Sequence, residues 1–211
     1  MSRDEMNITQ GKDGLVRHIA PAIAFTLVTV IAFGIIYPVV MTLISEAIFP
    51  TQAGGAFVYE NGNIVGSDII GQAWTKPQYF HGRPSAAGNG YDPTSTGGTN
   101  LAPTSKKLID STKAAIDALK RQNPDATGPV PMDLVTSSAS GIDPDISPQA
   151  AYYQAPRVAK ARGLSLRTID AIVAANIEPR ELGFLGEPRV NVLALNLALD
   201  ASPKGEPSDR P

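Results

Sequence analysis

The stretch from Ile19 to Ser45 reads IAPAIAFTLVTVIAFGIIYPVVMTLIS and contains no Asp, Glu, Lys or Arg. It is longer than the about 20 apolar residues that a helix needs to cross the hydrocarbon core of a bilayer. In lipid, a single segment satisfies all of its backbone N–H and C=O groups only as a helix. The stretch therefore predicts one transmembrane helix, which we place at residues 19–48. Pro38 lies late in this helix and is expected to kink or end it.

A cleaved signal peptide is the alternative interpretation of this segment. Ser45, Glu46 and Ala47 weakly match the small-x-small pattern of a cleavage site. The apolar core of a signal peptide is only about 7–15 residues long, and this segment is nearly twice that length. We therefore interpret the segment as a membrane anchor that remains attached.

The charges that flank the apolar segment predict its orientation. Lys12 and Arg17 precede it, whereas the first positive side chain after it is Lys76. Positive residues close to a span stay on the cytoplasmic side. Residues 1–18 should therefore form a cytoplasmic tail, and the polar part of this tail, residues 1–14, is expected to be disordered.

The remainder of the chain predicts one extracytoplasmic soluble domain at residues 50–200, followed by a disordered tail at 201–211. The expected fold class is α+β with long loops, after the single N-terminal transmembrane helix. Asn61-Gly62 separates two short β-rich runs and is the strongest local hairpin signal. The segment 73–103 is rich in Gly, Pro, Ser and Thr, and its aromatic side chains should anchor it as an ordered loop.

Helical periodicity and capping residues predict the other elements of this domain. We expect helices at residues 104–122, 147–162 and 165–175. Pro156 should kink the second of these helices or divide it. Residues 131–135 indicate a short strand. Residues 190–199 indicate a buried strand, or a strand that turns into a short helix.

A search for catalytic chemistry in the sequence finds little. The chain has no Cys and only two histidines, which argues against a zinc site, and it contains neither a phosphate-binding loop nor a nucleophile elbow. Asp143 and Asp145, with Asp133 upstream, could bind a divalent cation, but we prefer the interpretation that they form a turn before a helix cap at Ser147. The net charge of −2 shows no bias toward nucleic acid. These observations favour an anchored accessory subunit or binding module.

Seven stretches of the sequence carry a resemblance to a known family. They are VGSDIIGQ (65–72), YFHGRPS (79–85), NLAPT (100–104), PVPMDLVT (129–136), SGIDPDISP (140–148), RVAKARG (157–163) and LGEPRVNV (185–192). In this order, after one N-terminal span, they resemble the C subunit of the bacterial Kdp potassium-transporting ATPase. The chain departs from that pattern at Ala102, where Gly is expected, and at Asp145, where His is expected.

The resemblance implies a non-catalytic accessory subunit of an ATP-driven, high-affinity potassium import complex in the bacterial inner membrane. Its implied partners are a channel-like K⁺-binding subunit, a P-type ATPase subunit and a small single-span subunit, besides the lipid bilayer. The family is also described as a catalytic chaperone that raises the ATP affinity of the ATPase subunit. ATP and K⁺ would then be handled by the complex, with no cofactor in this chain. The alternative is a free membrane-anchored periplasmic enzyme of unknown substrate.

Eight polar residues inside the family-like stretches are the candidate structural or partner-contact residues. They are Arg83, Asn100, Asp143, Arg157, Arg162, Glu187, Arg189 and Asn191. We expect most of them to form buried networks that hold a loop-rich domain without disulfides. The minority should contact the channel-like subunit.

Overall fold

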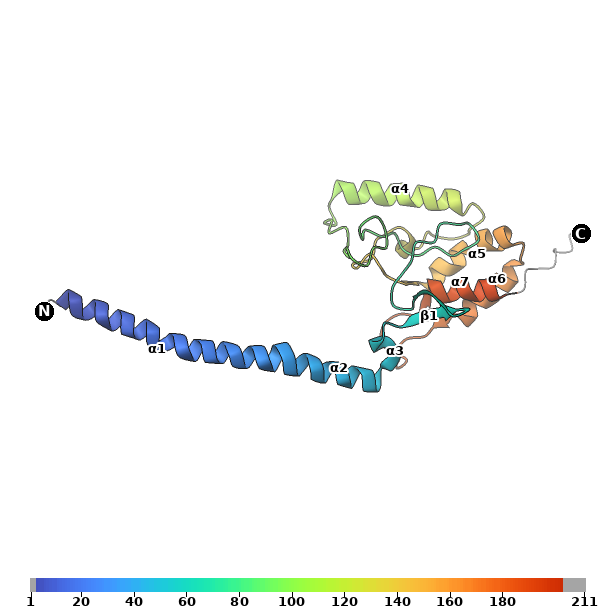
Figure 1. Cartoon of the computed structure of the whole chain (residues 1–211). Helices are drawn as coiled ribbons and strands as arrows, with labels where there is room; N and C mark the ends of the chain where they lie inside the picture. Colours follow the sequence, from blue (N-terminus) through green and yellow to red (C-terminus); the bar gives the residue numbers. More distant parts are fainter. Residues whose placement is uncertain (1–2, 203–211) are drawn as a thin grey trace, which may run out of the picture. The chain divides into compact units, whose positions relative to one another are not determined.

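The computed structural model describes residues 3–202, and the chain divides into two units between Ala56 and Phe57. The first unit is helical: α1 (Arg3–Ile31), a π-helical segment η1 (Ala32–Ile36), α2 (Tyr37–Ile48) and the short α3 (Pro50–Ala53) (Figure 1). Within the described part of the chain, one helix, Arg17–Ile48, is long and apolar enough to cross a membrane, and its most apolar window is entirely unburied. The predicted N-terminal helix is therefore confirmed.

Two details of this unit differ from the sequence-based expectation. The prediction of disorder is wrong for residues 3–14, which continue α1 as a helix. A helix that has nucleated extends at little cost, and Arg, Glu, Met, Gln and Lys are good helix formers, so the two glycines do not stop it. Pro38 does not end the span, because it lies in the first turn of α2 directly after η1, where the hydrogen-bonding pattern changes from α to π.

The second unit begins with the predicted hairpin, formed by β1 (Phe57–Glu60) and β2 (Asn63–Ser67). Asn61 and Gly62 have φ values of 50° and 80°. Both turn positions thus need a left-handed backbone, which Asn and Gly adopt most readily. The hairpin prediction is confirmed.

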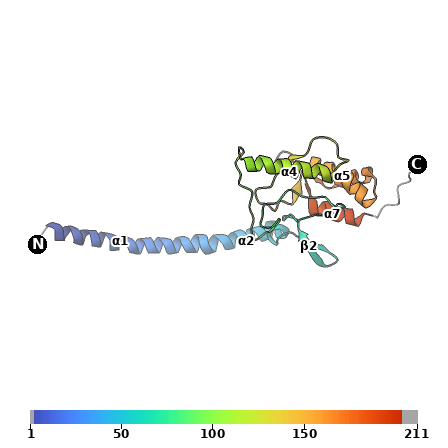
Figure 2. The same ribbon diagram turned by 90° about the horizontal axis from the view of Figure 1, so that it is seen from above.

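In the described part of the second unit, four α-helices follow: α4 (Lys106–Gln122), α5 (Pro148–Arg162), α6 (Leu166–Ala175) and α7 (Val192–Ala201). The side chains of Ser147 and Ser165 cap α5 and α6, as their positions before apolar runs predict. α5 is one continuous helix through Pro156, so of the two expected outcomes, a kink or a division, the division is excluded. α5 packs against α6, and α6 packs against α7. The coil between β2 and α4 runs between α4 and α7 in both views (Figure 2).

A small antiparallel sheet closes the second unit, with strand order β3 (Asp145–Ile146), β5 (Arg189–Asn191), β4 (Ile177–Glu178). Strand β5 leads directly into α7, as expected for residues 190–199. The predicted strand at 131–135 is wrong. Residues Met132–Leu134 form a 3₁₀ helix, η2, in which Leu134 N–H donates to the carbonyl of Pro131. Pro129 and Pro131 lack the N–H groups that a strand ladder requires.

The core of the second unit lies among α5, α6, α7 and the small sheet. Its fully buried large apolar side chains are Phe80, Val158, Ile169, Val173, Val190, Leu195 and Leu199. Phe80 comes from the long coil, and it is as fully buried as the helical residues around it. The coil is therefore ordered by an aromatic anchor, as expected, and it lies where polar side chains of α5 and α7 can reach its backbone.

Candidate functional site

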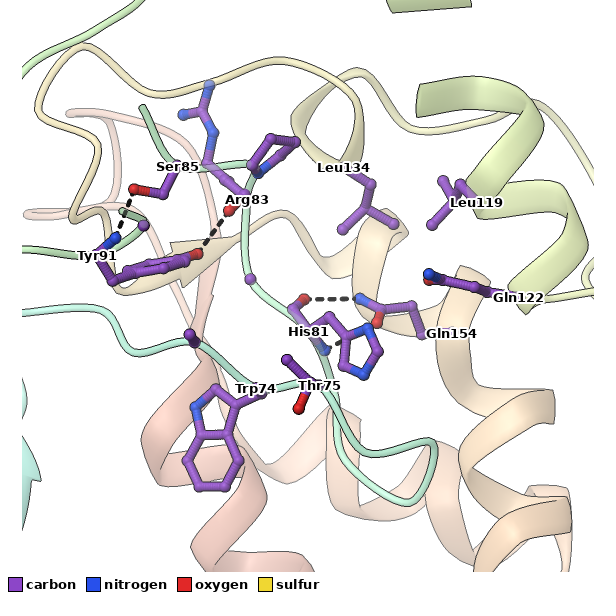
Figure 3. A pocket seen from close by; sticks show the side chains of 14 residues that line it. Trp74, Thr75, His81, Arg83, Ser85, Tyr91, Leu119, Gln122, Leu134 and Gln154 are labelled. Atoms are coloured by element: carbon purple, nitrogen blue, oxygen red, sulfur yellow. Dashed lines mark hydrogen bonds between the residues drawn. The ribbon is translucent and has the colours of Figure 1, made fainter. Parts of the chain in front are cut away.

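The backbone of residues 77–81 is bound by side chains of α5 and α7, an arrangement that we call the loop clamp. Asn196 accepts a hydrogen bond from Phe80 N–H (2.9 Å) and donates one to Phe80 C=O (3.0 Å). Gln154 does the same for His81, accepting from N–H at 2.9 Å and donating to C=O at 3.0 Å (Figure 3). Each side-chain amide thus binds both the N–H and the C=O of one loop residue, in the way that a residue of a neighbouring strand does in an antiparallel β-sheet.

Two arginines complete the loop clamp. Arg157 is buried, and its guanidinium donates to the carbonyls of Pro77 and Tyr79. The same guanidinium donates to Oδ1 of Asn123 (2.9 Å) and to Oε1 of Gln154 (2.8 Å). Neutral oxygens thereby solvate a buried cation. Burial lowers the pKa of Arg157 to about 10, so it remains charged at neutral pH.

Arg162 binds the loop one turn further along α5. It donates to the carbonyls of Gln78 (2.8 Å) and Leu199 (3.1 Å) and forms an ion pair with Asp200 (2.8 Å). Its guanidinium lies over the ring of Tyr79, 5.0 Å from the centroid, and the Tyr79 hydroxyl donates to the same carboxylate. Arg162 thus links the loop to the C-terminal end of α7.

His81 is the one histidine of the second unit, and it faces a pocket beside the clamp. Burial and the charge of Arg157 lower its pKa, while its bond with the Lys76 carbonyl opposes the shift. The ring is therefore neutral at pH 7. The other histidine of the sequence, His18, belongs to α1 in the first unit.

The pocket has a volume of about 290 Å³ and is drawn in Figure 3. Tyr91 closes one side: its hydroxyl donates to the Arg83 carbonyl (2.6 Å), and its N–H donates to Oγ of Ser85 (2.7 Å). Burial raises the pKa of Tyr91 to about 12. Trp74 Nε1 and Arg83 Nε are buried without a hydrogen-bond partner among residues 3–202. In Figure 3 the guanidinium of Arg83 points away from Trp74, so these two donors do not converge on one ligand position.

A second polar cluster surrounds Arg189 on β5. Its guanidinium lies 2.7 Å from Glu178, 3.3 Å from Glu181 and 3.3 Å from Asp145. Burial outweighs the attraction of Arg189 and raises the pKa of Asp145 to about 6. This cluster ties the three strands of the small sheet to the loop that joins β4 to β5.

The three acidic residues considered for a divalent cation are each bound to protein groups. Asp143 pairs with Arg83 at 3.0 Å and accepts a bond from Asp145 N–H, while Asp133 accepts one from Ser147 N–H at 2.7 Å. This arrangement agrees with the alternative of a turn that precedes the cap of α5. Among residues 3–202, no group of three or more His, Cys, Asp or Glu side chains could hold a metal ion.

Comparison with known proteins identifies the family. The family model "K+-transporting ATPase, c chain" (KdpC) matches residues 19–201, a range that contains nearly all of the apolar helix, the loop clamp and the Arg189 cluster. The chain belongs to the KdpC family.

Curated relatives agree with this match over nearly their whole length. Three are the potassium-transporting ATPase KdpC subunits of Acidobacterium capsulatum, Bradyrhizobium diazoefficiens and Methylococcus capsulatus, which are 51%, 50% and 47% identical to this chain. The alignments cover 87%, 88% and 89% of this chain and 97%, 98% and 99% of the relatives. The resemblance seen in the seven sequence stretches is thereby confirmed.

The structure distributes the eight candidate residues of this KdpC-family chain among different sites. Arg157 and Arg162 belong to the loop clamp, and Arg83 and Asp143 form one ion pair. Arg189 is the centre of the second cluster, beside which Glu187 pairs with Arg180 at 2.6 Å. Asn191 caps α7 through Ala194 N–H and donates to the Asp68 carbonyl. Asn100 is exposed, with a left-handed φ of 51°.

Sequence reasoning missed two members of the loop clamp, Gln154 and Asn196, and also Asn123, which supports Arg157. Asn196 interrupts an apolar run, and Gln154 lies on the buried face of α5, so a polar residue within an apolar stripe was the available signal. Asn123 was interpreted only as the end of α4, and indeed it is the C-cap residue there. Its second role, accepting from Arg157, has no local sequence signal.

Proposed function

We propose that this chain is the non-catalytic accessory subunit of an ATP-driven potassium import complex. The observation that carries the proposal is the KdpC family match over residues 19–201, which includes the anchor as well as the second unit. Relatives matched over nearly their full length are named potassium-transporting ATPase KdpC subunits. The alternative of a free periplasmic enzyme has no comparable support.

The chain would lie in the inner membrane with its N-terminus in the cytoplasm and its second unit outside. Lys12 and Arg17 before the span, and no positive residue after it until Lys76, support this orientation. The family match begins at Ile19, within the apolar helix, which supports an anchor that is retained rather than a cleaved signal peptide.

A positioning role rather than catalysis is supported by how the polar side chains are used. Arg157, Arg162, Gln154 and Asn196 direct their hydrogen bonds to backbone groups of the clamped loop. Asn191 caps a helix. Side chains whose hydrogen bonds are all used within the protein keep its surface in one conformation, which suits a subunit that binds other subunits.

The effect on ATP is then indirect. With the second unit outside the membrane, only about 18 residues of the chain would face cytoplasmic ATP, by the charge rule. A subunit that contacts two conformations of the ATPase subunit unequally shifts the balance between them, and thereby changes ATP affinity without touching ATP. The channel-like, P-type ATPase and small single-span subunits are the proposed partners.

Co-purification from detergent tests this proposal. The tagged full chain should bring down the other subunits, and removing it should abolish K⁺-stimulated ATP hydrolysis. Supplying the full chain again should restore both activity and apparent ATP affinity. A chain that purifies alone, or a complex that is fully active without it, would contradict the proposal.

Saturable binding of ATP to the isolated full chain at physiological salt would contradict the indirect account alone. It would leave the assignment as an accessory subunit intact, and it would instead support direct participation of this chain in nucleotide binding.

A further inference from the structure

The loop that joins β4 to β5 presents large apolar side chains to water. Leu182 is 82% exposed, Phe184 67% and Leu185 49%. Scattered apolar residues on a surface need no explanation, but three within four positions form a local patch. We call residues 181–185 the apolar turn.

The apolar turn is a built structure. Glu181 and Leu185 exchange two backbone hydrogen bonds, of 3.0 Å and 2.9 Å, and Phe184 N–H donates to the Glu181 carbonyl. Leu182 and Gly183 both have a left-handed backbone, with φ values of 53° and 84°. This conformation is unfavourable for leucine, whereas Gly or Asn would adopt it readily. The backbone conformation at position 182 therefore does not explain why leucine occurs there, which points to a role for its side chain.

Ion pairs hold the base of the apolar turn. Arg180 lies 2.6 Å from Glu187, and Arg189 bridges Glu181 and Glu178 across the two strands. The backbone of the turn is thus fixed at both ends, so little further backbone freedom is lost when a partner covers it. Such preorganisation strengthens binding, because the cost of ordering is met when the protein folds.

The charges around the apolar turn indicate a protein partner. Two arginines, Arg180 and Arg189, form ion pairs there with the carboxylates of Glu178, Glu181, Glu187 and Asp145, so the surroundings of the turn carry no excess of positive charge. An apolar centre within a polar rim is the usual anatomy of a protein–protein interface. A segment that inserts into an anionic lipid surface instead carries an excess of Lys and Arg.

We propose that Leu182 and Phe184 are the anchor side chains by which the second unit docks into an apolar socket on another subunit of the transport complex. This inference rests on the proposed function, since it requires that complex. It adds the segment and the chemistry of the contact: two apolar side chains on a rigid turn, bordered by paired charges.

The test is the double variant Leu182→Gly/Phe184→Ser in the full chain, assembled with the other subunits. Glycine adopts the left-handed backbone at position 182 freely, so the turn is kept while the side chain is removed. The control is Met132→Ser, since Met132 is 73% exposed elsewhere on the second unit. The measurements are the thermal unfolding of each purified chain and its dissociation constant from the complex in detergent.

We expect the double variant to unfold at the wild-type temperature or above, and to bind the complex roughly tenfold or more weakly, as loss of interface anchors does. Met132→Ser should bind as the wild type does. A double variant that binds with wild-type affinity overturns the inference, while a wild-type chain that does not assemble overturns the proposed function itself. A defect seen only in a reconstituted bilayer would assign the turn to lipid, and a change only in the number of copies of this chain would assign it to self-association; either result overturns the inference.

Discussion

Asn196 and Phe80 exchange two hydrogen bonds although 116 residues separate them in the chain. Both residues are fully buried, so water cannot reach the N–H and C=O groups of Phe80. The side chain of Asn196 binds both groups instead. The contact joins α7 to the long coil at the point where the coil's aromatic side chain enters the core. The order of a loop-rich unit without disulfides thus depends on single polar side chains inside an apolar core.

Replacing Asn196 by leucine should therefore destabilise the second unit strongly. The variant leaves the N–H and C=O groups of Phe80 buried without partners, at a cost of about 1–3 kcal/mol for each group. We expect an unfolding temperature lower by roughly 5 °C or more, measured by thermal unfolding of the purified chain. Asn63→Leu on the exposed hairpin is the control, and equal effects of the two variants would contradict the role of the clamp.

Arg157 should not tolerate lysine. The guanidinium serves four acceptors that lie in different directions, whereas an ammonium group has three donors on a single nitrogen. At least one buried acceptor then loses its partner, so the free energy of unfolding should fall by about 1–3 kcal/mol. Chemical denaturation measures this change. Arg121→Lys, on the exposed end of α4, should have no measurable effect, and an equally neutral Arg157→Lys would show that charge alone suffices.

Asp145 should make stability depend on pH. Burial raises its pKa in the folded protein to about 6, above the ordinary 3.8. A raised acid pKa means that the unfolded state loses its proton first, so this group costs the folded state stability as the pH rises from about 4 to 6. Asp145→Asn removes that cost. The stability of the variant relative to wild type should thus increase over this pH range, by at most about 3 kcal/mol. Denaturant titrations at about pH 4.5 and pH 7 measure the difference, and a difference independent of pH would exclude this account.

The orientation of the span should depend on Lys12 and Arg17. A reporter enzyme that is active only outside the cytoplasm, fused after Gln52, should be active in the wild-type chain. Changing both positive residues to glutamate should lower that activity and raise the activity of a cytoplasmic reporter at the same position. An inactive external reporter in the wild-type chain would reverse the proposed topology.

Removing residues 1–49 and exporting the remainder should abolish complex activity. In the proposed complex the anchor would keep the second unit at a high effective concentration beside its partners, and an untethered unit would lose this advantage. The measurement is K⁺-stimulated ATP hydrolysis with the truncated chain at physiological concentration. The control replaces the span by an unrelated single-span anchor of the same orientation. If tethering is the only role of the span, this control restores activity, whereas a failure to do so would show that the span itself makes necessary contacts.

The sequence by itself determined the features that depend on neighbouring residues. The charge-free run from Ile19 predicted the span, and Asn61-Gly62 predicted the hairpin, because a left-handed turn needs those residue types. Ser147 and Ser165 predicted helix starts, since each side chain bonds a backbone N–H three residues on.

Only the tertiary structure decided which distant groups meet. The apolar character of residues 131–135 suggested a strand, but no strand among residues 3–202 pairs with them, and prolines remove donors. Arg157 was recognisable as a candidate, but its pairing with carbonyls about 80 residues away was not. The same holds for Gln154 and Asn196, because such pairing depends on how helices and coil pack together, and no local pattern in the sequence encodes that arrangement.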